Sequence, residues 1–545
     1  MPSKVVGQKF TSIPRQRFDG GINYTFGSRQ IGDNESPDAV NCDFKGKTGV
    51  GNRMGYTQLG SASAYNQGKG LSQFHTASID QAIKFVSNGT NVVLSYSTGG
   101  AWTDVTGTTF TSKNIDTCQG ASKLYTGNGT EVMREWNGTA WADTTDGTKG
   151  YYPTYFNSRV WIKDETYEDM LNFSGQYGGT DNAEVNSGAT TPVTADNLGK
   201  FTAASAGWVQ FKAGSGAKIN GIVTFKNALY ILLSDSIYRV SPAPTADTFT
   251  VELITNSIGC VSHRSIRQVE EDIYFAGDDG VYSLGDVANY TAVRTTNKSG
   301  KVQRIFDNLS ATQKQALCGC YFNFKYYLFY QLGSNNNDAC LVYDIRYKAW
   351  QDWRNMSAID SKVITLANQR RMFFIEPTTA KVQEMGVGVT DDGVSINSYW
   401  TSKSFDEKIP DVMKFYFDTS FLFGVLNGTV DISVIFDDYE IAATTTLSQS
   451  KPMGGFGRNV VGDGFIGALA ITGASPVRYQ GGLGFALNTV TVTQSYNYPQ
   501  RLKAKGKKYA IQYKVSSSNF WRLDSISQYL SAFDHFKILA SLKLN

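Results

Sequence analysis

Alternating aromatic and aliphatic positions, cut by short polar turns, recur between about residues 70 and 390. The two clearest copies are NALYILLSDSIYRV at 227–240 and EDIYFAGDDGVYSL at 271–284, about 44 positions apart (271 against 227). Weaker copies lie at 85–102, 124–141, 155–161, 321–350 and 363–375. Period-two alternation bounded by Gly, Asn and Asp predicts short β-strands joined by turns. The chain therefore contains about seven such units.

The spacing of the units is roughly 30–55 residues, which is typical of the blades of a β-propeller. Each blade is a small sheet that cannot bury its faces alone and must stack on its neighbours. No WD or kelch signature is present, and an array of β-sandwiches would give similar local patterns. The propeller is the preferred prediction, with the sandwich array as the alternative.

We predict an all-β protein, a β-propeller-like repeat domain with an insertion plus a C-terminal β-sandwich-like domain. Residues 1–69 are expected to form a strap packing on the core. Residues 70–393 form the propeller, with a Gly-, Ala-, Thr- and Ser-rich insertion at about 174–219. Residues 394–545 form the second domain, which carries a Gly-rich arm at about 444–500.

Two helix starts stand out in this strand-rich pattern. Ser36 before Pro37 is typical of an N-cap followed by proline at the first helical position. Ser310 and Gln313 have the spacing of a capping box, which predicts a helix of about two turns before the strand at Tyr321.

Composition agrees with a β-rich chain and argues against a dedicated DNA binder. Aromatic residues make up 13% of the 545 positions, and Gly (54) far exceeds Pro (12). The net charge is only +3, from 51 basic and 48 acidic residues, whereas a duplex-DNA binder is normally much more basic. The basic residues gather near both ends, and we interpret the clusters as solvated loops: Lys4, Lys9, Arg15 and Arg17, then Arg501, Lys503, Lys505, Lys507 and Lys508.

The six cysteines form no CxxC pair, which indicates synthesis in a reducing compartment. Cys318 and Cys320 are two apart, so on a strand they share one face and are expected to be small core residues. No run of 18 apolar residues predicts a membrane span, and the first residues lack the apolar region of a signal peptide.

Candidate catalytic chemistry is sparse. The three histidines (His75, His263 and His535) are far apart, and no zinc, P-loop, dinucleotide or nucleophile-elbow motif is present. Paired carboxylates raise the hypothesis of a glycosidase, which needs two carboxyl groups several ångströms apart. Asp-Asp and Asp-Gly sequences are also common in tight turns, where Asn is equally suitable. We therefore interpret three pairs as turn residues: Asp278-Asp279, Asp391-Asp392 and Asp437-Asp438.

Three tryptophans could form a sugar-stacking platform. Tryptophans at strand ends more often pack between blades, and that is the preferred interpretation for Trp102, Trp136 and Trp141. We therefore predict no enzyme activity and no catalytic, cofactor-binding or metal site.

Residues 19–56 contain sequence motifs that are more specific than the overall composition. It reads DGGIN at 19–23, IGDNESPDAVN at 31–41 and GNRMGY at 51–56. This resembles the opening of the bacteriophage (podovirus-type) tail nozzle, or tail tubular protein B-like, families. IGCVSHRSI at 258–266 with DGVY at 279–282 resembles their mid-propeller blade, and SYWTSK at 398–403 with VMKFYF at 412–417 resembles their following strand pair.

The resemblance implies a virion structural protein of the tail, made in the cytoplasm of the host bacterium. Such nozzles form a ring of copies, usually six, below the portal and adaptor, and they extend the channel through which the genome leaves. The implied partners are further copies of the chain, the tail adaptor protein, tail fibre or spike proteins, and genomic DNA that passes without sequence-specific binding. A near-neutral conduit suits that role, because tight phosphate binding would hold back the DNA.

Two alternatives stay open at this point: a glycan-binding or glycan-cleaving propeller, and another tail hub or baseplate protein. The last expectation concerns residues 1–56, which hold little continuous apolar surface. We expect this strap to tie the propeller to the second domain and to help set the ring interface. Its deletion is expected to leave a soluble protein with near-native β content that no longer forms a ring with its tail partner.

Overall fold

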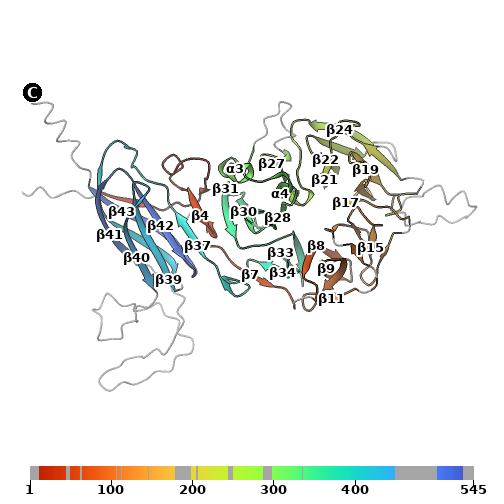
Figure 1. The fold of residues 1–545 in the computed structure, drawn as a ribbon, viewed down its shortest axis with the longest axis horizontal. Coiled ribbons are helices and arrows are strands. Elements are labelled where there is room, and N and C mark those ends of the chain that lie inside the picture. The colour runs from red at the N-terminus through yellow and green to blue at the C-terminus, as the bar shows by residue number, and fades with distance from the viewer. Residues whose placement is uncertain are drawn as a thin grey trace, which may run out of the picture.

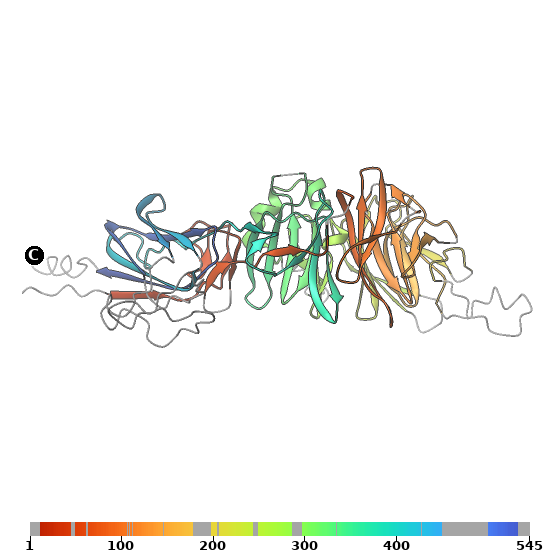
Figure 2. The same cartoon turned by 90° about the horizontal axis from the view of Figure 1, so that it is seen from below.

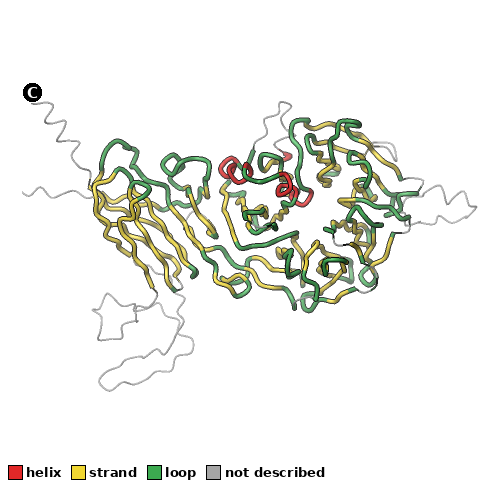
Figure 3. Tube along the Cα trace, viewed as in Figure 1, coloured by secondary structure: helices red, strands yellow, loops and turns green. Residues whose placement is uncertain are grey.

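The computed structural model describes residues 11–44, 49–61, 64–105, 107, 109–111, 113–144, 146–177, 198–203, 206–242, 249–285, 297–333, 335–426, 428–448 and 500–531. Strands dominate these residues, and the few helical turns lie on one side of the ring (Figure 3). Figure 1 looks onto the face of the ring, with a second β-rich body beside it. Figure 2 shows the two bodies in line along the long axis of the molecule.

Seven sheets form the ring in the described part of the chain, and they are antiparallel except for the parallel pair of β7 and β35 in the seventh. The first blade contains β8 (Gln67–His75), β9 (Asp80–Ser87), β10 (Asn91–Ser97), β11 (Thr103–Asp104) and β12 (Phe110–Thr111), and the second contains β13 (Asp116–Gly120), β14 (Lys123–Gly127), β15 (Arg134–Trp136) and β16 (Trp141–Asp143). The third blade contains β17 (Tyr151–Phe156), β18 (Arg159–Lys163), β19 (Met170–Phe173) and β20 (Gly207–Gln210), and the fourth contains β21 (Ile219–Phe225), β22 (Ala228–Leu233), β23 (Ile237–Pro242) and β24 (Phe249–Thr255).

The last three sheets complete the circle, and the seventh takes one strand from the start of the chain. The fifth blade contains β25 (Arg267–Val269), β26 (Asp272–Ala276) and β27 (Val281–Ser283), and the sixth contains β28 (Cys318–Phe322), β29 (Lys325–Tyr330), β30 (Ala339–Asp344) and β31 (Ala349–Arg354). The seventh blade contains β32 (Asp360–Leu366), β33 (Gln369–Ile375), β34 (Val382–Met385), β7 (Tyr56–Gln58), β35 (Thr390–Asp391) and β36 (Val394–Ser395).

Each of the seven units predicted from the sequence falls in a different sheet, so the propeller prediction is confirmed. Apolar clusters lie between neighbouring sheets, because a blade can bury its faces only against the next blade. Phe85 of the first blade packs with Trp141 of the second, for example, and Cys318 and Cys320 of the sixth pack with Phe374 of the seventh. The shared face predicted for the two cysteines is thereby confirmed.

The remaining strands, apart from a two-stranded sheet near the start of the chain, form a two-sheet sandwich that combines both ends of the chain. One sheet contains β1 (Thr11–Arg15), β5 (Cys42–Phe44), β6 (Val50–Asn52), β38 (Lys414–Leu426), β41 (Gln500–Lys508) and β43 (Trp521–Ser531). The other contains β4 (Asp38–Val40), β37 (Ser398–Thr401), β39 (Thr429–Phe436), β40 (Glu440–Ser448) and β42 (Ile511–Ser517).

One apolar cluster runs without a break from the ring into the sandwich. It includes Tyr326 of the sixth blade, Ile22 and Phe44 of the N-terminal segment, and Trp521 and Ile526 of the sandwich. Burial of apolar surface is the main favourable term in folding, so this shared cluster couples the two bodies energetically.

Residues 11–58 do more than pack on a finished core. They supply four strands to the sandwich and one to the ring, where β7 lies between β34 and β35. The expectation that residues 1–56 can be deleted with near-native β content is therefore wrong, because β6 already pairs with β43 inside a sheet. The boundaries at 69/70 and 393/394 stay predictions, and strand pairing crosses both of them.

Local predictions had mixed outcomes. The capping box at Ser310 and Gln313 is confirmed and opens α4 (Ala311–Gln315), which follows η2 (His263–Ser265), η3 (Gly300–Val302) and α3 (Gln303–Asp307). The helix at Ser36-Pro37 is wrong, because Ser36 ends β3 (Glu35–Ser36), which pairs in parallel with β2 (Gly21–Ile22). Tertiary pairing overrode the local signal there.

The two predicted projections are shorter than expected. In the insertion at 174–219, residues 207–210 form β20, the fourth strand of the third blade, and Phe211 is buried. In the arm at 444–500, β40 runs on to Ser448 and β41 begins at Gln500. Residues 178–197 and 449–499 lie outside the described residues.

Ring closure by β7 gives the first testable prediction. Thr57 pairs with Glu384 of β34, and the N–H of Leu59 donates to Val382, so by antiparallel alternation the Thr57 N–H faces β34. Thr57→Pro removes this ladder bond and leaves its acceptor unsatisfied, which should lower the free energy of unfolding by about 1–3 kcal/mol. Thr57→Ala is the matched control, because the side chain is exposed. Equal melting temperatures for the two variants would show that β7 does not hold the ring closed.

Candidate functional site

The side chain of Arg53 is fully buried where the N-terminal segment passes between the ring and the sandwich. Its two Nη atoms donate to both carboxylate oxygens of Asp391, at 2.8 and 2.6 Å. Nε donates to Oδ1 of Asn41 at 3.0 Å, and Nη2 also donates to the carbonyl of Arg354 at 3.2 Å. The exposed fractions of the Arg53 and Asp391 side chains are 0% and 8%. This one guanidinium therefore connects the N-terminal segment to the sixth and seventh blades.

Asn41 extends the same joint to the sandwich. Its backbone has φ 56°, a left-handed conformation that Asn adopts more readily than most residues. Its N–H donates to the carbonyl of Asp352, and its Oδ1 accepts from the N–H of Arg354 at 2.7 Å. Its Nδ2 donates at 2.8 Å to the carbonyl of Asn397, just before β37. Asn41 thus links the outer strand of the sixth blade to the sandwich.

The segment at 19–35 is held by a second set of contacts. Glu35 pairs with Lys301 at 2.8 Å and accepts from Nδ2 of Asn23 at 2.9 Å. Burial would raise the pKa of Glu35, but Lys301 and Asn23 outweigh it and hold the pKa below its usual value. Gly21 has φ 73°, and an added Cβ would overlap the carbonyl oxygen of Trp350. Gly21 is therefore needed for the close approach of this segment to the sixth blade.

A buried carboxylate, Asp352, lies beneath this segment. Tyr330 donates to Oδ1 at 2.9 Å, Tyr24 donates to Oδ2 at 3.2 Å, and Arg354 donates to Oδ2 at 3.0 Å. Burial raises the pKa of Asp352, although Arg354 and Tyr330 oppose that shift. The hydrogen bond from Tyr24 is a further tie between the N-terminal segment and the sixth blade.

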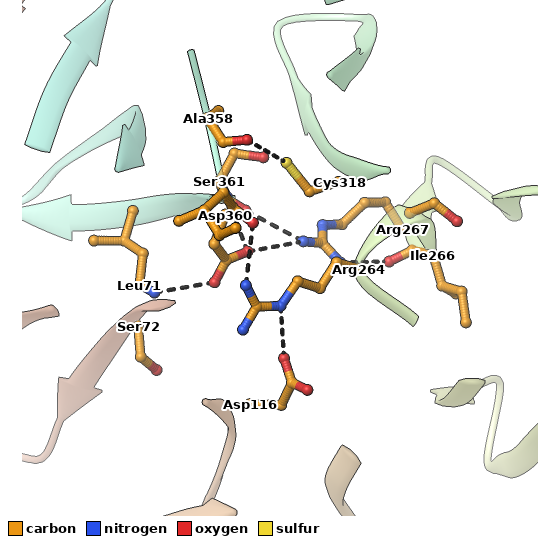
Figure 4. A network of polar contacts seen from close by, with 12 residues as sticks. Leu71, Ser72, Asp116, Arg264, Ile266, Arg267, Cys318, Ala358, Asp360 and Ser361 are labelled. Carbon is orange, nitrogen blue, oxygen red and sulfur yellow. Dashed lines mark hydrogen bonds and ion pairs between the residues drawn. The ribbon is translucent and has the colours of Figure 1, made fainter. Parts of the chain in front are cut away.

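A separate polar network fills the centre of the ring (Figure 4). Arg264, in η2 before the fifth blade, reaches across the ring and donates through Nε to Asp116 of the second blade at 2.9 Å. Its other nitrogens donate to the carbonyls of Lys69 at 3.1 Å, Ile115 at 2.8 Å and Ile359 at 3.1 Å. The Arg264 and Asp116 side chains are only 11% and 16% exposed. One guanidinium thus joins the first, second, fifth and seventh blades.

Asp360 adds a second acceptor to this network. Its Oδ2 accepts from the backbone N–H of Leu71 at 3.0 Å, and its Oδ1 lies 3.7 Å from Nη2 of Arg267. Figure 4 shows Asp360 beside both arginines. The centre of the ring is therefore occupied by ion pairs and hydrogen bonds at this level.

His263, next to Arg264, is a packed core residue. Its ring stacks on Tyr152 of the third blade with centroids 4.4 Å apart, and Nδ1 accepts from the N–H of Ile222 at 3.4 Å. Burial lowers the pKa of His263 to about 4, although Asp116 opposes that shift. The imidazole is therefore neutral at pH 7 and contributes by packing.

Two of the three predicted carboxylate pairs lie in turns, as expected. Asp278 pairs with Lys314 at 3.0 Å, and Asp279 accepts a hydrogen bond from Tyr282 in the turn between β26 and β27. Asp437 and Asp438 form the turn between β39 and β40, with φ 52° and 71°. Left-handed φ is characteristic of tight hairpin turns and is tolerated by Asp and Asn.

The third pair was interpreted wrongly in one of its residues. Asp392 is a turn residue, with φ 47° and an ion pair to Lys381 at 2.7 Å. Asp391 instead points inward to Arg53, so Asn in its place would not be neutral.

The tryptophans pack between blades rather than forming a platform. Trp136 and Trp141 are 0% and 3% exposed, and they join the cluster between the first two blades. Trp102 donates from Nε1 to the carbonyl of Leu59 at 2.9 Å. The preferred prediction of blade packing is confirmed.

Among the residues that the structure describes, no three His, Cys, Asp or Glu side chains gather in a way that could hold a metal ion. His75 is exposed beside Asp80, and His535 lies outside the described residues. The described helices include none that is long and apolar enough to cross a membrane.

The N-terminal basic cluster is only partly solvated. Arg17 is exposed and pairs with Asp19, but Arg15 is 12% exposed, pairs with Glu407 and lies 3.4 Å over the ring of Phe405. Lys4, Lys9 and the side chains at 501–507 lie outside the described residues, but the backbone at 500–508 forms β41, so the interpretation of the C-terminal cluster as a loop is wrong.

Sequence reasoning did not single out the central network. Arg264 and Asp116 are 148 positions apart in the chain, and Asp360 lies in yet another blade, so the three share no local motif. The one available signal was the run IGCVSHRSI at 258–266, which contains both Arg264 and His263.

No family model matches the chain, and no curated protein does. The chain is similar to a solved structure of YCF48 bound to a D1 peptide, at 10% identity and a TM-score of 0.35, over 62% of this chain and 97% of that chain. It is also similar to BamB from Moraxella catarrhalis, at 10% identity and a TM-score of 0.34, over 70% of this chain and 100% of that chain. The AfRom2 CNH domain matches at 8% identity and a TM-score of 0.33, over 61% of this chain and 98% of that chain. The division of the ring into seven blades rests on the strand pairing of this chain.

Adjacent aspartates offer a matched test of the joint. Asp391→Asn leaves the buried Arg53 without its counter-ion and should lower the free energy of unfolding by about 3–5 kcal/mol. Asp392→Asn removes only a partly exposed pair from a turn that suits Asn, and should change it by less than about 1 kcal/mol. Urea denaturation followed by tryptophan fluorescence measures both. If both variants unfold at the same urea concentration, the Arg53–Asp391 pair does not hold the joint.

Proposed function

We propose that the chain is a non-catalytic structural protein of a short-tailed bacteriophage tail, a nozzle that forms a ring and extends the DNA ejection channel below the portal and adaptor. It would be made in the cytoplasm of the host bacterium and reside in the virion tail. Its partners would be further copies of itself, the adaptor, and tail fibre or spike proteins.

The observation that carries the proposal is the position of the residues behind the resemblance. Gly21 and Asn23 belong to the motif at 19–23, Glu35 and Asn41 to the motif at 31–41, and Arg53 to the motif at 51–56. All five fix the N-terminal segment between the ring and the sandwich. The resemblance to the nozzle families therefore rests on residues that make specific contacts in this joint, and not on residues that only form turns.

The occupied centre of the propeller bears on where DNA would pass. Arg264 and its partners fill the axis of this ring, so a genome could not thread a single copy there. In a nozzle, the channel would lie between copies that are arranged around a common axis. The net charge of +3 suits such a conduit, because few phosphate contacts would retard the DNA.

Exposed apolar side chains offer surface for contacts between copies. Tyr439 and Ile441 on the β39–β40 hairpin are 80% and 67% exposed, Val394 is 68% exposed, and Trp208 on β20 is 63% exposed. Exposed aromatic and aliphatic side chains of this kind are typical of protein–protein contacts.

Electron microscopy of the purified full-length chain, alone and mixed with the adaptor from the same genome, tests the proposal. We expect ring-shaped particles containing several copies, and mass photometry should give one discrete oligomer mass. The same preparation should show no binding or cleavage on a panel of bacterial surface glycans.

Particles that stay monomeric both alone and with the adaptor would contradict the nozzle. Saturable glycan binding or cleavage by such a monomer would favour the alternative of a glycan-directed propeller.

A further inference from the structure

A cavity of about 540 Å³ opens at the inner strands of the fifth, sixth and seventh blades. The residues that give it chemical character are Arg267 on β25, Glu270 after it, Tyr321 on β28, Lys362 on β32 and Arg370 on β33. It neighbours the network in the centre of the ring, because Arg267 also approaches Asp360. Three cations and one carboxylate thus face the same space.

The single carboxylate in this lining is already engaged. Glu270 accepts a hydrogen bond from the hydroxyl of Tyr321. Arg267 donates to the carbonyls of Ile266 at 2.7 Å and Ser361 at 3.2 Å, which fixes the orientation of its guanidinium. The positive charge of the cavity is therefore preorganised on rigid strands rather than on a mobile loop.

Lys362 is the cation of this lining without a direct ion pair, although Asp360 and Asp116 lie near enough to favour its charged form. Its ammonium makes no hydrogen bond or ion pair within 4 Å among the residues that the structure describes, although its side chain is largely covered by the inner strands. Burial lowers the pKa of Lys362; Asp360 opposes that shift, and Arg267 adds to it. A desolvated ammonium without a direct partner gains most from a bound anion.

We propose that this cavity binds a phosphate group, either free phosphate or the phosphate of a small monoester. Lys362 and Arg267 supply the charge, Arg370 lines the same cavity, and the planar donors of the arginines suit the oxygen geometry of phosphate. A dianion would balance the excess positive charge of the lining and contact cations of the fifth and seventh blades. This site is independent of assembly into a tail.

Titration calorimetry of the full-length protein at pH 7 and constant ionic strength tests the site. Inorganic phosphate and glycerol 3-phosphate are the probes, and acetate is the carboxylate comparison. We expect saturable binding of at least one phosphate probe and none of acetate. Tighter binding of glycerol 3-phosphate would identify the monoester as the ligand class, and tighter binding of phosphate would identify the free ion.

Lys362→Met should raise the dissociation constant at least ten-fold. Lys218→Met is the matched control, because Lys218 precedes the inner strand β21 and pairs with Glu168 on the surface. Arg370→Gln is the second variant, on an exposed side chain, and should weaken binding about three-fold even if Lys362→Met fails to fold. Absence of saturable phosphate binding, or unchanged affinity in Arg370→Gln and in a folded Lys362→Met, would overturn the proposal.

Discussion

A fully buried guanidinium must find acceptors for all its donors, and Arg53 meets that constraint only when three parts of the molecule come together. Asp391 comes from the seventh blade, the carbonyl of Arg354 from the sixth, and Asn41 from the strand that leads to the sandwich. Any relative displacement of these parts would leave charge buried without a partner. The joint therefore has one geometry, and the rest of the architecture follows from it.

The path of the N-terminal segment explains why the two bodies behave as one. The segment supplies strands to both sheets of the sandwich and then closes the propeller through β7. Gly55, between Arg53 and β7, has no room for a Cβ beside the backbone of Thr390, so the chain can make this passage only with glycine. The apolar cluster from Tyr326 to Trp521 covers the same junction. Separate unfolding of either body would expose part of that shared core.

Features set by local sequence could be predicted, and features set by distant partners could not. The seven blades were found because period-two alternation and Gly-Asp turns repeat within each unit, and the Ser310 capping box needs only its own four residues. The same local reasoning failed at Ser36-Pro37, where pairing with β2 overrode a helix signal. It also failed at Asp391, which looks like its turn neighbour Asp392 until Arg53, 338 positions away, is brought beside it. The Arg264 network was missed for the same reason, since its acceptors come from blades on the far side of the ring.

The central claim is that the N-terminal segment makes the propeller and the sandwich one cooperative unit. Differential scanning calorimetry of the full-length protein tests it most directly. The account predicts a single transition, with a calorimetric enthalpy equal to the van't Hoff enthalpy. Two resolved transitions, or a calorimetric enthalpy well above the van't Hoff value, would show that the two bodies unfold independently and would contradict it.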